Sequence, residues 1–110
     1  MKNDKFIIIQ TTYPNLKSAK NLAEILLKEK LSACIHLQKI ESLYFWEKKI
    51  QNDAEILVNI KTKKSKFLAI EKLIKKHHSY KLPQITATEI IKGSKDYLSW
   101  IETSLTKKVK

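Results

Sequence analysis

The sequence contains no arginine, one glycine, two prolines and one cysteine. The single cysteine, Cys34, excludes an internal disulfide and is typical of a protein kept in a reducing compartment. Because Gly93 is the only glycine, the chain has no glycine-rich phosphate loop. Hydrophobic residues make up 43% of the 110 residues, which is too many for a disordered chain. These features predict one compact domain over residues 1–110.

Long hydrophobic runs are also missing. The first ten residues, "MKNDKFIIIQ", hold an apolar run of only four residues, which is too short for the core of a signal peptide. No later run approaches the length that a membrane-spanning helix needs. We therefore expect a cytoplasmic protein that has no membrane partner.

The net charge is +11, and all of the basic residues are lysines. A basic domain suggests nucleic acid as a partner, because neutralising phosphates releases counterions. Base readout and bidentate phosphate contacts, however, favour the arginine guanidinium. Codons rich in A and T would also produce such a lysine-rich chain without selection for binding. Non-specific nucleic-acid binding is therefore the least favoured hypothesis, and its candidate face is the lysine cluster Lys61, Lys63, Lys64, Lys66, Lys72, Lys75 and Lys76.

Apolar periodicity predicts a strand around "KFIIIQTTY", followed by an amphipathic helix from Leu16 to Lys30 that Asn15 caps. Two long extended segments, Leu31 to Glu47 and Ile50 to Lys63, form a hairpin. The apolar parity of the first segment switches near "QKIE", residues 38–41, which predicts a bulge or a bend there.

The second half of the chain is predicted to form a helix, a strand and a further helix. Ser65 is predicted to cap a second helix that runs to about His77, and "LPQITATEII" reads as a fourth strand. Gly93 then ends this strand, and Ser94 is predicted to cap a final helix. The order is that of a ferredoxin-like split-βαβ fold (βαββαβ plus a C-terminal helix). This is an α+β arrangement in which an antiparallel sheet carries helices on one face and has a long β-hairpin.

The predicted hairpin is too long for the helices to cover. Its arms extend about 45 to 50 Å at roughly 3.3 Å per residue, whereas a 15-residue helix spans about 22 Å. Aromatic residues left in water on an open-edged hairpin would promote aggregation, so a second copy of the chain is the expected cover. A hairpin that folds back over its own sheet is the alternative. The candidate interface residues are Leu43, Tyr44, Phe45 and Trp46.

Several segments, in order and at matching spacing, resemble the CutA divalent-cation-tolerance family over nearly the whole chain. They are "TTYPN", "SAKNLAEILLKEKLSACIH", "SLYFWEKKI", "EILVNIKTKKSKF", "HHSYKLPQI" and "YLSWI". The resemblance implies a homotrimer formed through the long hairpins, related in architecture to the PII signalling proteins. It also implies a role in tolerance of copper and other divalent metals.

The chain departs from the family pattern at several positions. Ser79 stands in place of a proline in the His-Pro-Tyr motif, and Gln84 replaces a glutamate, so a carboxylate near the candidate site is lost. Lys48 occupies a position where the family has glycine. His36 replaces an asparagine, and Thr11 stands where some members carry a cysteine.

The candidate metal ligands are His77 and His78, with Cys34 as a weaker third. Neutral imidazole is a common ligand of Cu(II) and Zn(II), but the neighbouring lysines repel cations. We expect no obligatory cofactor and at most weak binding of Cu(II) or another divalent cation. The alternative for both histidines is a helix end that satisfies exposed carbonyl groups, and for Cys34 a small buried hydrophobic residue.

Other functional classes have less support in the sequence. No nucleophile–base signature or close carboxylate pair is present, so we expect no enzymatic activity. A small-molecule sensor of the PII type stays an alternative, with its ligand bound in clefts between subunits. The other cleft candidates are Lys61, Tyr80 and Gln84. The structural alternative for Lys61 is an ion pair with Glu55 across the subunit boundary.

Overall fold

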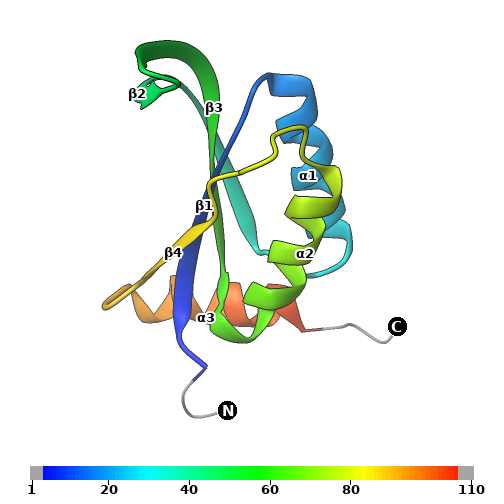
Figure 1. Cartoon of the computed structure of the whole chain (residues 1–110). Helices are drawn as coiled ribbons and strands as arrows, with labels where there is room; N and C mark the ends of the chain where they lie inside the picture. Colours follow the sequence, from blue (N-terminus) through cyan, green and yellow to red (C-terminus); the bar gives the residue numbers. More distant parts are fainter. Residues whose placement is uncertain (1–3, 107–110) are drawn as a thin grey trace.

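The structure is a computed structural model and describes residues 4–106. Its elements follow the predicted order, with a final helix after the fourth strand (Figure 1). The α+β, ferredoxin-like fold is therefore confirmed. The elements are β1 (Phe6–Tyr13), α1 (Leu16–Lys28), β2 (Cys34–Trp46), β3 (Lys49–Lys63), a short 3-10 helix (Lys64–Lys66), α2 (Phe67–His77), β4 (Thr86–Glu89) and α3 (Lys95–Leu105).

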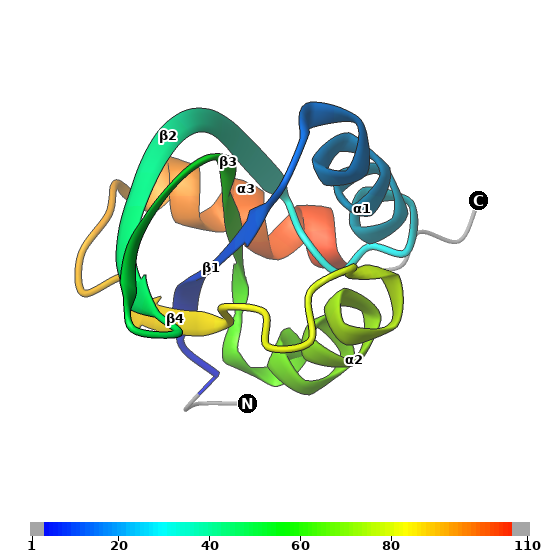
Figure 2. The ribbon, with the colours of Figure 1, turned by 45° about the horizontal axis from the view of Figure 1, so that its top comes forward.

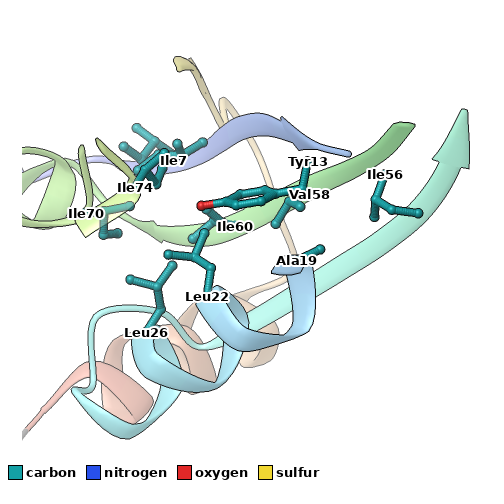
Figure 3. Close-up of a cluster of buried hydrophobic side chains, with 11 residues drawn as sticks. Ile7, Tyr13, Ala19, Leu22, Leu26, Ile56, Val58, Ile60, Ile70 and Ile74 are labelled. Atoms are coloured by element: carbon teal, nitrogen blue, oxygen red, sulfur yellow. The ribbon is translucent and has the colours of Figure 1, made fainter. Parts of the chain in front are cut away.

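The four strands form one antiparallel sheet in the order β2-β3-β1-β4. Helices α1 and α2 lie side by side on one face of it (Figure 1). The core fills the space between these two helices and the sheet. It contains alternate residues of β1 and β3, because only one face of each strand points toward the helices. Figure 3 shows the ring of Tyr13 lying among these side chains. The fully buried members are Ile9, Tyr13, Ala19, Leu22, Leu26, Val58, Ile60, Ile70 and Ile74.

The last helix, α3, contacts the opposite face of the sheet. Lys61 of β3 donates a hydrogen bond to the Tyr97 hydroxyl at 3.2 Å, and Lys63 contacts Glu102 at 2.8 Å. These two lysines have the opposite parity to Val58 and Ile60, which face α1 and α2. The pair α1 and α2 therefore occupies one face as predicted, while the added C-terminal helix lies against the other.

Two of the three predicted helix caps are confirmed. The Asn15 side chain accepts a hydrogen bond from the Ser18 backbone at 2.8 Å, and the Ser94 hydroxyl accepts one from Tyr97 at 3.2 Å. Ser65 does not cap α2, which begins later, at Phe67. Its backbone N–H instead donates to the carboxylate of Asp4 at 2.8 Å. Asp4, 61 positions away, thus satisfies a donor of the 3-10 helix before α2, whereas no side chain among residues 4–106 caps α2 itself.

The hairpin is bent and contains no bulge. Pairing runs without interruption from Cys34↔Lys61 to Trp46↔Lys49, so the two strands keep a single register. The strands coil strongly instead (Figure 2), as the right-handed twist of a two-stranded ribbon allows. This coiling accounts for the parity switch, in which Leu37 and then Ile40 are the half-buried residues.

The turn of the hairpin has two residues with positive φ, Glu47 at 51° and Lys48 at 64°. Both angles lie in the left-handed region that the two-residue hairpin turn of type I′ requires. Glycine adopts this region without the steric cost that a side chain brings. Lys48 therefore holds a strained backbone conformation at the position where the related family has glycine.

Candidate functional site

An open groove of about 820 Å³ lies beside the hairpin, between its far half and the loop of residues 80–84. It brings together three predicted interface residues, Leu43, Tyr44 and Trp46, with two predicted cleft residues, Tyr80 and Gln84. Phe45, the fourth predicted interface residue, is 71% exposed and does not line this groove. The remaining lining residues are Thr12, Glu41, Ser42, Asp53, Glu55, Lys81 and Leu82.

Glu55 of β3 joins the two walls of the groove. Its Oε1 accepts a hydrogen bond from the Ser42 hydroxyl at 2.6 Å, within the hairpin. Its Oε2 accepts one from the Tyr80 hydroxyl at 2.7 Å, across the groove. Sequence reasoning placed Glu55 on the polar side of a strand and expected it to pair with Lys61 across the subunit boundary. That parity was the one signal that marked it.

Both tyrosines of the groove are held in their neutral form. Desolvation, together with the hydrogen bond to Glu55, raises the pKa of Tyr80 well above its ordinary value. The pKa of Tyr44 is raised chiefly because its hydroxyl donates a hydrogen bond to Asp53. Both hydroxyl groups therefore act as hydrogen-bond donors to carboxylates of the groove.

His78 is held by hydrogen bonds at both ring nitrogens. The Tyr80 backbone N–H donates to Nδ1 at 3.1 Å, so Nδ1 carries no proton. Nε2 therefore carries the proton and donates it to the Thr12 carbonyl at 2.6 Å. The ring also stacks on Tyr13, at a centroid distance of 4.1 Å. In this arrangement His78 has no free nitrogen to offer a metal.

The three predicted metal ligands do not meet within one chain. His77 is exposed at the end of α2, while His78 turns inward toward β1. Thr12, the partner of His78, pairs through Leu57 with Gln38 on β2. Cys34 lies four residues before Gln38, or about 13 Å along the strand at roughly 3.3 Å per residue. Residues 4–106 contain no group of three or more His, Cys, Asp or Glu side chains that could hold a metal ion.

Lys61 also lies apart from the groove. Its ammonium group donates to Tyr97 on α3 and lies 5.2 Å from the centroid of that ring. Within the chain, Glu55 accepts hydrogen bonds from two hydroxyl groups. The ion pair between Lys61 and Glu55 across the subunit boundary stays a prediction. The polar residues of β3 thus contact two different parts of the chain. Lys61 contacts α3 at one end of the strand, and Glu55 lines the groove toward the other end.

The fold and the groove define a small ferredoxin-like domain with an extended, exposed hairpin. Residues 7–104 match the family described as "CutA1 divalent ion tolerance protein". The chain therefore belongs to the CutA family, which confirms the resemblance seen in the sequence.

Relatives of known sequence agree with this assignment. Protein CutA 1, chloroplastic, of Oryza sativa is 40% identical over 89% of this chain, although the match spans only 56% of the rice protein. The divalent-cation tolerance protein CutA of Archaeoglobus fulgidus is 37% identical over 88% of this chain and 95% of its own length. This chain thus spans about half the length of the plant relatives that it matches.

Solved structures show the same fold. The crystal structure of CutA1 from Oryza sativa has a TM-score of 0.90 at 37% identity and covers 98% of this chain and 100% of the other. The structure of the periplasmic divalent cation tolerance protein CutA from A. fulgidus has a TM-score of 0.89 at 36% identity, covering 92% of this chain and 99% of the other.

The compartment expected from the sequence stays a prediction. Plant relatives are named as chloroplastic and the A. fulgidus structure as periplasmic. Among the helices within residues 4–106, none is long and apolar enough to cross a membrane.

Proposed function

We propose that this protein acts as a cytoplasmic homotrimer of the CutA type, without catalytic activity, in the response to divalent cations. The observation that carries the proposal is the exposed apolar far end of the hairpin, where Phe45 is 71% and Ile50 is 74% exposed. The bend of the hairpin leaves these side chains in water, and apolar surface of this kind marks an interface. Two further copies of the chain would cover it.

The oligomeric state is tested by light scattering at micromolar concentration. We expect a mass of three times 12.9 kDa. A mass near 12.9 kDa would refute the assembly and with it the proposed role of the hairpin.

Metal binding is proposed to be weak, with Cu(II) bound ahead of Zn(II) by the usual order of affinities. His77 supplies the accessible nitrogen, because a metal at His78 would have to displace a hydrogen bond at one of its ring nitrogens. Cys34 would reach a metal at the histidines only from another copy of the chain. Calorimetric titration of Cu(II) and Zn(II) into the trimer measures this affinity, and the absence of any heat would refute metal binding.

Small-molecule sensing is the second candidate, and the groove favours it. The groove combines apolar and aromatic walls with a few convergent polar groups, which is the usual composition of a ligand site. A thermal-shift screen of metabolites tests this candidate, because a ligand that binds only the folded state raises the melting temperature.

Nucleic-acid binding has the least support. Two members of the lysine cluster already contact carboxylates, Lys63 at Glu102 and Lys75 at Glu71. If the cluster were a binding face, affinity would fall steeply with salt and show little sequence preference. The absence of binding at low salt would remove this candidate.

A further inference from the structure

The groove has walls that are held in place before any ligand arrives. Tyr80 crosses it to bind Glu55, and His78 fixes the start of the same loop to the end of β1 through Thr12. Ser42 holds the other carboxylate oxygen of Glu55. A site that is organised in advance loses less conformational entropy when it binds a ligand.

The charge of the groove opposes the charge of the protein. Three carboxylates line it, those of Glu41, Asp53 and Glu55, against one ammonium group, that of Lys81. Within residues 4–106 none of these carboxylates contacts a cationic side chain at ion-pair distance. A protein of net charge +11 thus has an acidic hollow, which attracts a cation and repels an anion.

The walls of the groove are aromatic as well as acidic. Tyr44, Trp46 and Tyr80 supply rings, and Leu43 and Leu82 add apolar surface. Aromatic faces attract organic cations through their π electrons, and they contact the apolar stem of such a ligand at the same time. A hydrated metal ion gains little from these walls.

The hydrogen bonds of Glu55 leave room for such a ligand. A carboxylate has about four acceptor positions, and the hydroxyls of Ser42 and Tyr80 occupy two of them. An ammonium or guanidinium group can donate to the others. A divalent metal would need more ligands at short range, and residues 4–106 contain no group of three or more His, Cys, Asp or Glu side chains that could hold one.

We propose that this groove binds a small organic cation, an ammonium or guanidinium group on a short apolar stem. Glu55 is the anionic contact, and Trp46 and Tyr80 supply aromatic contacts. The inference deepens the sensing candidate by naming its ligand class.

The test uses the full-length Trp100→Phe variant, in which Trp46 is the only tryptophan and reports on the groove by fluorescence. The probes are choline and its uncharged isostere 3,3-dimethylbutan-1-ol, together with agmatine. We expect the cations to bind at least ten-fold more tightly than the neutral isostere. Equal affinities for choline and the isostere, or no response to any cation, would overturn the inference.

A matched pair of variants locates the binding. Glu55→Gln removes the charge and keeps the size, and we expect at least a ten-fold loss of choline affinity. Glu24→Gln makes the same change on an exposed position of α1 and should leave affinity unchanged. Equal affinity in both variants would place the site elsewhere and refute the proposal. Thermal unfolding of each variant verifies that it is folded.

Light scattering on the same samples separates this inference from the proposed assembly. A monomer that still binds choline would refute the trimer alone. A trimer that binds no cation would refute the organic-cation site alone.

Discussion

The imidazole of His78 lies stacked on the phenol ring of Tyr13, with 4.1 Å between the ring centroids and 26° between the planes. This contact joins the loop after α2 to the end of β1. Because Tyr80 follows two residues later, the stack also determines where the Tyr80 hydroxyl meets Glu55. His78 is thus a structural element of the groove wall.

The first prediction separates the two adjacent histidines by stability. His78→Ala should lower the free energy of unfolding by about 1 to 3 kcal/mol, because it removes two hydrogen bonds and an aromatic contact. His77→Ala, at an exposed position, should change it by less than about 0.5 kcal/mol. Urea unfolding measures both. In the Cu(II) titration, His77→Ala should weaken binding more than His78→Ala, and the reverse order would contradict this assignment.

The second prediction concerns the proposed trimer interface. Phe45→Ala should shift the assembly toward smaller species, because truncating an aromatic residue that becomes buried costs about 3 to 5 kcal/mol. Leu68→Ala, which truncates a 75% exposed apolar residue on α2, is the control and should leave the mass unchanged. Sedimentation velocity over a dilution series measures the effect. If Phe45→Ala dissociates no more readily than the wild type, the hairpin is not the main interface.

The third prediction is a pH dependence at Tyr13. Burial raises the pKa of Tyr13 to about 12, from 10.0 in the unfolded chain. The folded state therefore holds this proton more tightly. The resulting stabilisation is complete below pH 10 and is lost as the pH rises from 10 to about 12. Over that range the wild type should lose about 2 to 3 kcal/mol more stability than Tyr13→Phe.

The same Tyr13→Phe variant has a second expected outcome at pH 7. The Tyr13 hydroxyl is buried without a hydrogen-bond partner among residues 4–106. Removing it should leave the free energy of unfolding unchanged or raise it by up to about 1 kcal/mol. A clear loss of stability at neutral pH would reveal a bound partner, such as an ordered water molecule.

The fourth prediction addresses the strained turn of the hairpin. Lys48→Gly should raise the free energy of unfolding by about 0.5 to 1 kcal/mol, because the left-handed conformation of Lys48 costs about 1 to 2 kcal/mol and the added backbone entropy of glycine offsets part of the gain. Lys39→Gly, at an extended position of β2, should destabilise the protein. A destabilised Lys48→Gly variant would show that the turn gains more from the lysine side chain than it loses in strain.

The fifth prediction tests Asp4 as the cap of the 3-10 helix that precedes α2. Asp4→Ala should cost about 1 kcal/mol, as the loss of a helix cap does. Desolvation raises the pKa of Asp4, but hydrogen bonds from Ser65 and the charge of Lys63 outweigh it and hold the pKa below 3.8. The contribution is therefore present above pH 3.8 and is lost as the pH falls through the folded-state pKa. Glu24→Ala is the control, and equal stabilities of the two variants would argue against the cap.

Local patterns in the sequence determined the secondary structure and the core. Asn15 lies directly before an amphipathic helix and caps it, because a cap depends on neighbours within one turn. The alternation of Ile56, Val58 and Ile60 placed one side of β3 in the core. The hairpin length also indicated that its far end would be uncovered, and Ile50 is indeed exposed. The motif order identified the family.

Only the tertiary structure decided how the groove is built. Glu55 and Tyr80 are 25 residues apart, and Thr12 and His78 are 66 apart, so no local period relates them. The sequence suggested two histidines as a ligand pair, because adjacent side chains of one type look equivalent. In the fold, His77 is exposed to water, whereas both ring nitrogens of His78 form hydrogen bonds within the chain. Which polar atoms are already satisfied depends on pairings between distant segments, and those pairings exist only once the sheet and helices have come together.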